Sequence, residues 1–200
     1  MKLKQLPALI LLAAMLLSLP SCKDKETVEV PKETQAVTNN INTAVTSDIP
    51  SAYLIPMTKL LGEWGSRKGS MSDPLIGARI LMYEKTKDEV GFAILDIDGN
   101  GVEEMIVAPI DDFKTNGMVY DVLTIKDSQA LHLANSLEAT YHFMNDGSFI
   151  LRTPENNAYT FKRVTVNGVE RPTEVEITEE EASKCIVSTV ELTPFSALEK

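Results

Sequence analysis

Hydrophobic residues follow two different spacings along the chain, and the change falls near residue 89. Before it, one set recurs at intervals of three and four residues, which is the spacing of a single helix face: Tyr53, Met57, Leu60, Leu61 and Trp64. This set predicts a helix that packs against a core, with Pro56 either kinking it or starting it. Ser72-Asp73-Pro74 indicates a second helix start, and a strand over 79–83 is the open alternative.

After Glu89 the hydrophobic residues fall in short runs typical of strands. These runs cover 92–95, 105–108, 118–125, 131–134, 139–144, 148–152 and 159–166. Turn-forming residues separate several of them, as in 126–128, 145–147, 154–157 and 167–168. The pattern predicts an antiparallel meander, with a solvated loop around Asp111 and Asp112 after Pro109.

The last part of the chain has the pattern of a helix. Thr178 and Glu181 have the spacing of a capping box. One helical stripe follows, made of Ala182, Cys185, Ile186, Thr189 and Val190. We therefore expect an α+β fold: an N-terminal helix or helices, an antiparallel β-meander and a C-terminal helix. It forms one globular domain over 51–200, with Cys185 as a buried, inert thiol.

The segment Asp96-Ile97-Asp98-Gly99-Asn100-Gly101-Val102-Glu103-Glu104 has the composition of a metal-binding loop. Oxygen-bearing side chains stand at its first, third, fifth and ninth positions, and glycines allow positive-φ turns between them. Calcium takes six to eight oxygen ligands, whereas magnesium prefers a smaller octahedral shell rich in water. We predict a structural Ca²⁺ site with these ligands: Asp96, Asp98, Asn100 and Glu104 by their side chains, and Val102 by its carbonyl oxygen. A hairpin turn that needs no ion is the alternative.

The loop differs from an EF-hand, because Val107 occupies the twelfth position, where an EF-hand has a bidentate glutamate. It resembles instead the calcium loops of integrin-type FG-GAP repeats, which place the ninth-position carboxylate on the returning strand of a hairpin. With the following strands and the tail Leu192-Thr193-Pro194-Phe195, the chain resembles small uncharacterised lipoproteins of gut bacteria. That resemblance implies a calcium hairpin and no known enzymatic activity.

The N-terminus has the pattern of an export signal. Lys2 and Lys4 precede an apolar stretch at 6–19, too short for a comfortable membrane span. Leu19-Pro20-Ser21-Cys22 then resembles the lipobox of bacterial lipoproteins. The resemblance implies a signal peptide over 1–21, cleavage before Cys22, and lipidation of that cysteine by diacylglycerol and an acyl chain such as palmitate. Residues 22–50 then form the lipid anchor and a flexible tether.

This anchor places the protein in the bacterial cell envelope. In a diderm bacterium Lys23, which stands where an inner-membrane retention signal would have aspartate, favours the outer membrane. In a monoderm bacterium the site is the outer leaflet of the cytoplasmic membrane. The membrane, through the lipid, is then a partner, and an envelope protein or glycan is another candidate.

Composition narrows the possible functions. Lys+Arg 19 against Asp+Glu 29 gives a net charge of −10, which disfavours nucleic acid as a partner. Two cysteines and two histidines leave little for a disulfide framework or a histidine-rich zinc site. His132 and His142 are expected to be separate surface residues, with a metal pair across a hairpin as the alternative. No catalytic motif stands out, so the sequence favours a Ca²⁺-stabilised binding or structural module. The alternative is a small envelope enzyme, for example a glycan hydrolase using acidic residues.

Overall fold

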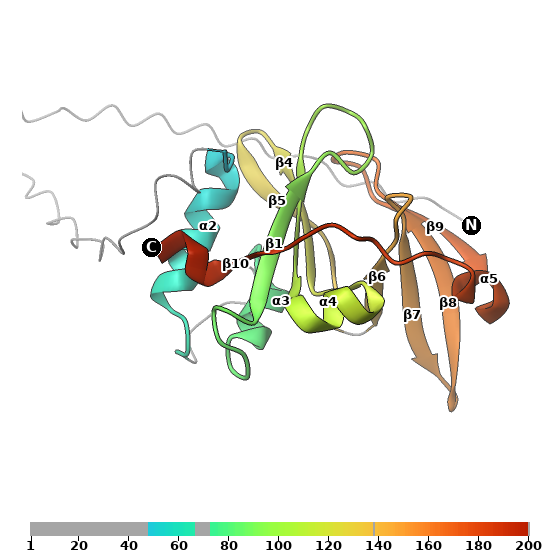
Figure 1. Cartoon of the computed structure of the whole chain (residues 1–200). Coiled ribbons are helices and arrows are strands. Elements are labelled where there is room, and N and C mark those ends of the chain that lie inside the picture. The colour runs from blue at the N-terminus through green and yellow to red at the C-terminus, as the bar shows by residue number, and fades with distance from the viewer. Residues whose placement is uncertain (1–47, 67–72, 138, 200) are drawn as a thin grey trace, which may run out of the picture. The chain divides into compact units, whose positions relative to one another are not determined.

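The computed structural model describes residues 48–66, 73–137 and 139–199. They form a mixed fold of two antiparallel five-stranded sheets and short helices (Figure 1). The first sheet, here sheet A, has the order β10-β1-β2-β4-β5, and the second, sheet B, has the order β3-β6-β7-β8-β9. The predicted α+β class is confirmed, but the strands form two sheets rather than one meander.

The helices and strands have the following bounds. The helices are α2 (Ser51–Gly62), α3 (Ile76–Leu81), α4 (Ile110–Asn116), α5 (Glu179–Ser183) and the 3-10 helix η1 (Phe195–Glu199). Sheet A contains β1 (Val90–Leu95), β2 (Glu104–Pro109), β4 (Asp121–Lys126), β5 (Gln129–Asn135) and β10 (Thr193–Pro194). Sheet B contains β3 (Met118–Val119), β6 (Thr140–Phe143), β7 (Phe149–Glu155), β8 (Ala158–Thr165) and β9 (Thr173–Ile177).

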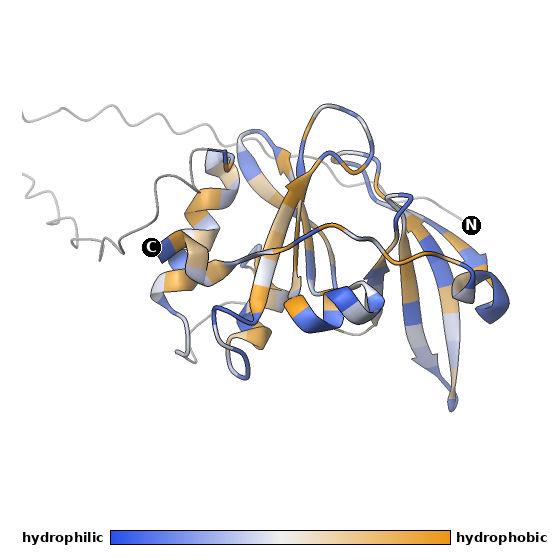
Figure 2. Ribbon diagram, viewed as in Figure 1, coloured by the Kyte–Doolittle hydropathy of each residue, from blue (hydrophilic) through white to orange (hydrophobic). Residues whose placement is uncertain are grey.

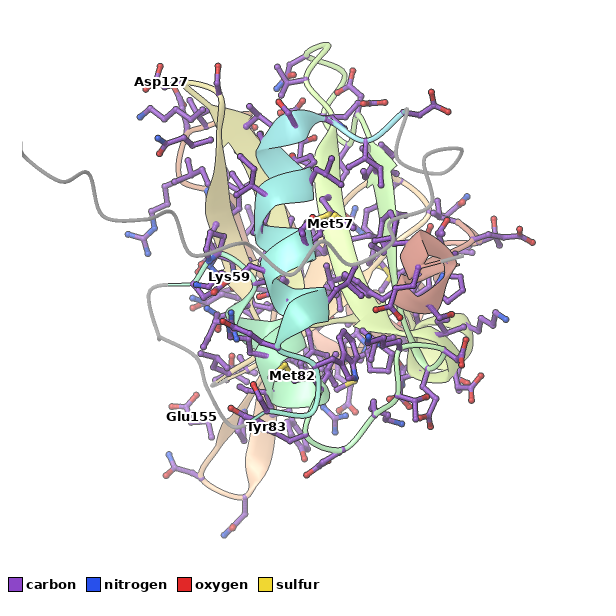
Figure 3. The ribbon with its side chains drawn as sticks, turned by 90° about the vertical axis from the view of Figure 1, so that its left-hand side faces the viewer. Met57, Lys59, Met82, Tyr83, Asp127 and Glu155 are labelled. Atoms are coloured by element: carbon purple, nitrogen blue, oxygen red, sulfur yellow. The ribbon has the colours of Figure 1, made fainter. Side chains whose placement is uncertain are left out.

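Sheet A is covered on both faces, which explains why its central strands are almost continuously apolar. Successive side chains of a strand point to opposite faces. Phe92, Met105 and Leu123 accordingly join a core with α2, α3 and η1, whereas Ile106 and Val122 join a second core with sheet B. Figure 2 shows apolar colouring concentrated on these central strands. Figure 3 views the helix side, where α2 lies in front of the strands.

The N-terminal helical stripe is confirmed. Helix α2 begins at Ser51 and buries Tyr53, Met57, Leu60 and Leu61, so Pro56 lies inside it rather than at its start. After the second predicted helix start, at 72–74, the chain forms helix α3, so the alternative of a strand over 79–83 is wrong. The Asp73 carboxylate accepts a hydrogen bond from the Leu75 amide at 3.1 Å and so fixes the turn that leads into α3.

Two segments differ from the sequence prediction. The solvated loop expected after Pro109 is wrong: residues 110–116 form α4, with Asp111 and Asp112 in its first turn, where they favour the helix dipole. Phe113 is the one residue that α4 buries, so the segment shows no apolar periodicity. Strand β9 was also missed, because most of its residues are exposed at the edge of sheet B.

The C-terminal helix is much shorter than its apolar stripe predicts. The capping box is confirmed, because Thr178 and the Glu181 side chain bond each other's backbone amides, but α5 ends at Ser183. The chain then runs beside β6, where the Ser188 amide donates to the Phe143 carbonyl at 3.1 Å. Ile186 is 70% exposed, so spacing alone does not make this stripe a buried helix face.

Candidate metal centre

The loop between β1 and β2 has the backbone that a metal-binding hairpin needs. Leu95 and Glu104 are paired across the two strands, so the loop closes directly onto the ladder. Gly99 and Gly101 have φ of 75° and 86°, values that side chains disfavour, so the predicted positive-φ turns are confirmed. The Asp96 carboxylate accepts hydrogen bonds from the amides of Gly99 and Gly101, at 2.8 and 2.9 Å. These bonds wrap the loop around Asp96.

Three of the predicted ligands come together. One carboxylate oxygen from each of Asp96, Asp98 and Glu104 lies within 4.8 Å of the others. Asp96 is exposed, Asp98 is half-buried and Glu104 is fully buried. Within the described part of the chain, none of the three forms an ion pair with a lysine, arginine or histidine. The cluster therefore gathers negative charge without a protein cation beside it.

Glu104 is held rigidly in this cluster. Its Oε2 accepts from the Ile97 amide at 3.0 Å, and its Oε1 accepts from the Thr124 hydroxyl at 2.9 Å. Burial raises the pKa of the Glu104 carboxyl above its ordinary value, and the charges of Asp98 and Asp96 raise it further. The two hydrogen bonds act in the opposite direction but do not outweigh burial. A divalent cation would relieve this electrostatic cost.

Asn100 and Val102 are placed differently from the three carboxylates. The Asn100 Oδ1 accepts from the Val102 amide at 2.6 Å, and its Nδ2 donates to Asp98 at 3.0 Å. Val102 itself is exposed. The Asn100 amide thus braces the loop, and the two residues remain predicted ligands. The structure brings three carboxylates together, and solvent can reach the exposed side of the loop.

Parts of the surroundings could not be predicted from the local motif. The Gly168 amide, in the β8–β9 turn of sheet B, donates to the Asp98 Oδ2. The Tyr53 hydroxyl in α2 donates to the Glu103 carbonyl at 2.6 Å, and burial raises its pKa. Asn167-Gly168 is recognisable as a turn, but nothing in the sequence pairs that turn with the loop.

The other candidate residues do not form a second metal site among the described residues. His132 and His142 lie in different sheets: the first contacts the Asp121 carboxylate at 3.1 Å and the second the Asn116 carbonyl at 2.9 Å. The two histidines are therefore separate, as expected, and do not form the alternative metal pair, but both are partly buried rather than fully exposed. The prediction of a buried Cys185 is also wrong, since it is partly exposed and its Sγ accepts from Arg163 at 3.1 Å.

Comparison of the chain with protein-family models, with curated proteins and with solved structures gave no match. Among the described residues, no helix has the length and hydropathy needed to cross a bilayer. The signal peptide expected at 1–21, the lipidated Cys22 and the tether as far as residue 47 lie outside the described residues.

Proposed function

We propose that this chain is a lipid-anchored protein of the cell envelope whose folded domain is stabilised by Ca²⁺ and serves as a binding or structural module. The observation that carries the calcium assignment is the meeting of Asp96, Asp98 and Glu104 within 4.8 Å. Hard oxygen ligands of this kind are those that Ca²⁺ binds. The Cys22 lipobox supports the anchor.

The ligand set follows from charge. Three carboxylates that converge without a cation repel one another, and one buried member, Glu104, cannot reach solvent to lower that cost. Binding of Ca²⁺ replaces the repulsion by attraction. Asn100 and the Val102 carbonyl would complete the shell together with water after a small rearrangement of the loop. Calcium then has a structural role. It stabilises the β1–β2 hairpin and, through Asp98, the position of the turn at Gly168.

Thermal unfolding with and without calcium tests the ion. Extracellular modules bind Ca²⁺ with Kd of about 10⁻⁴–10⁻³ M. At 10 mM Ca²⁺ the protein would gain roughly 1.4–2.7 kcal/mol by mass action. This corresponds to a rise in Tm of roughly 3–10 °C over a chelated sample. Magnesium at the same concentration should give a smaller rise.

A matched pair of variants assigns the effect to the loop. Asp96→Asn removes one ligand charge and should abolish most of the calcium-dependent rise in Tm. Asp127→Asn makes the same change in the exposed turn between β4 and β5 (Figure 3), and should leave the rise intact. An equal response of the two variants, or no rise in the parent protein, would reject the site.

The anchor is tested separately in a bacterial host. Metabolic labelling with a fatty acid should mark the wild-type protein, and Cys22→Ser should abolish both the label and cleavage at the lipoprotein site. Cys185→Ser is the control, because it removes the other cysteine and should leave labelling unchanged. Continued labelling of Cys22→Ser would reject the anchor.

A further inference from the structure

A cavity of about 420 Å³ lies on the face of sheet B that is turned away from sheet A. Its size is within the range of small-molecule sites. Apolar side chains from β7, β8 and the segment beside β6 form much of its wall: Met144, Ile150, Phe161 and Val187. The polar side chains include His142 and Arg152, which come from β6 and β7. It shares no residue with the carboxylate cluster of the β1–β2 loop.

Arg152 is the unusual member of this wall. Its Nε is buried from solvent and has no hydrogen-bond partner, and no ion pair joins the residue to any described carboxylate. The buried Arg79, by contrast, is paired with Asp73 and Glu63. In a chain with a net charge of −10, carboxylates are plentiful. A guanidinium left unpaired at a cavity is therefore available to an anion from outside the chain.

The position of Arg152 is fixed without using its hydrogen-bond donors. Its Cζ lies 3.6 Å from the centre of the Tyr159 ring, in a cation–π contact. Such a contact uses the flat face of the guanidinium and leaves its in-plane N–H groups free. Those groups match the two oxygens of a carboxylate in a bidentate arrangement. The contact with Tyr159 thus holds Arg152 in place without using its in-plane N–H groups.

Arg152 supplies the only positive charge among the described residues that line this cavity. The His142 Nδ1 lies 2.9 Å from the Asn116 carbonyl, which only accepts, so Nδ1 carries the hydrogen and Nε2 is left as an acceptor. Burial and the nearby Arg152 lower the pKa of His142, so the imidazole is neutral at neutral pH. Glu179 is the one carboxylate among the lining residues, and it is exposed on α5.

We propose that this cavity binds a small organic carboxylate. The carboxylate group pairs with the Arg152 guanidinium, and the apolar body of the ligand packs against Met144, Ile150 and Phe161. The neutral His142 adds an acceptor for a hydroxyl or amine of the ligand. The proposal is independent of the calcium loop, because the two sites have no residue in common.

The test uses two probes of the same size, 2-naphthoate and its neutral analogue 2-naphthamide, titrated into the full chain and followed by NMR shifts of the protein. Naphthoate should bind in the millimolar range or tighter, and about tenfold more tightly than naphthamide, as expected for one charge-assisted bidentate pair. Absence of naphthoate binding at 10 mM, or equal affinity for the two probes, would overturn the proposal.

Four variants assign the selectivity to this cavity. Arg152→Gln should bring the two affinities to the same value, and Arg152→Lys should leave an intermediate preference because it keeps the charge but loses the planar fork. Arg171→Gln removes an equal charge from an exposed residue outside the cavity and should change nothing. Glu179→Gln should tighten naphthoate binding by about twofold, since it removes a screened repulsion. Selectivity that survives Arg152→Gln in a folded protein would place the anion elsewhere and refute the assignment.

Discussion

Two groups of carboxylates in this molecule have opposite electrostatic surroundings. Beside α2 and α3, Asp73 is 2.7 Å from the buried Arg79 guanidinium, and Glu63 is 2.6 Å from the same group. In the β1–β2 loop, Asp96, Asp98 and Glu104 converge without any such cation among the described residues. The first group has its counter-charge in the chain, and the second has none among the described residues.

The pKa values of the two buried acids are shifted in opposite directions. Burial tends to raise the pKa of Asp73, but the bonds from the Leu75 amide, Arg79 and Lys59 outweigh it and hold that pKa below its ordinary value. Burial raises the pKa of Glu104, and its hydrogen bonds do not reverse the shift. An internal cation thus lowers the pKa of a buried acid, whereas Glu104, with no such cation among the described residues, keeps a raised pKa.

The largest expected effect comes from removing the internal cation. Arg79→Met should lower the free energy of unfolding by about 3–5 kcal/mol, because it leaves Asp73 buried without its arginine. Urea denaturation measures the loss. Lys59→Met is the control: its side chain is 55% exposed although it also contacts Asp73, so the loss should stay below about 1 kcal/mol. Equal losses for the two variants would mean that the burial of Arg79 does not increase its contribution to stability.

A smaller effect, with a change of sign, is expected at Glu104. In chelator, Glu104→Gln should raise the free energy of unfolding by about 1 kcal/mol, because it removes a charge that is buried and is also repelled by Asp98 and Asp96. The glutamine can accept from the Ile97 amide and donate to Thr124, so neither bond need be lost. In 10 mM Ca²⁺ the wild type should be the more stable of the two proteins, since only the wild type gains unfolding free energy from the ion.

Glu103→Gln provides the matched control for that inversion. It makes the same substitution at the adjacent, exposed residue, which is not part of the carboxylate cluster. Urea denaturation compares the unfolding free energy of each variant with that of the wild type, with and without calcium. Only Glu104→Gln should change from more stable than the wild type in chelator to less stable in calcium. If calcium changed the stability of the two variants by the same amount, Glu104 would be removed from the proposed ligand set.

The smallest expected effect is a pH dependence at Asp73. A pKa that is lower in the folded state gives stability that is present above the unfolded value and is lost as pH falls through the folded value. The difference in unfolding free energy between wild type and Asp73→Asn should therefore be constant near neutrality and shrink as the pH falls below about 4. A difference that grows on acidification would contradict the lowered pKa.

Local signals in the sequence predicted much of the site. The spacing of Asp96, Asp98 and Glu104, with glycines between, was enough to place three carboxylates together, because a tight hairpin determines its own geometry. Long-range partners were not predictable: the Gly168 amide comes from the other sheet, and Thr124 from a strand paired with β2. The unpaired Arg152 also depends on the register of β6, β7 and β8, which no short motif determines.

The fold was predicted best where burial is regular. The stripe of α2 matches the structure because it buries one helix face, and the apolar runs of β1 and β2 match because both faces of these strands are buried. Prediction failed where tertiary contacts override spacing. Helix α4 depends on one buried phenylalanine. The segment after α5 has helical spacing of apolar residues but is not helical, and it forms hydrogen bonds with β6. The division into two sheets likewise arises from packing of sheet B against one face of sheet A.

The bond between the Gly168 amide and Asp98 has a kinetic consequence. The two residues are 70 positions apart in the chain, so we expect the bond to form late in folding, after the β1–β2 loop and the β8–β9 turn have been brought together. An interaction made this late is absent from the folding transition state. Any stabilisation that a cation at Asp98 passes to this bond would therefore slow unfolding rather than speed folding, in contrast to its contacts within the local β1–β2 hairpin.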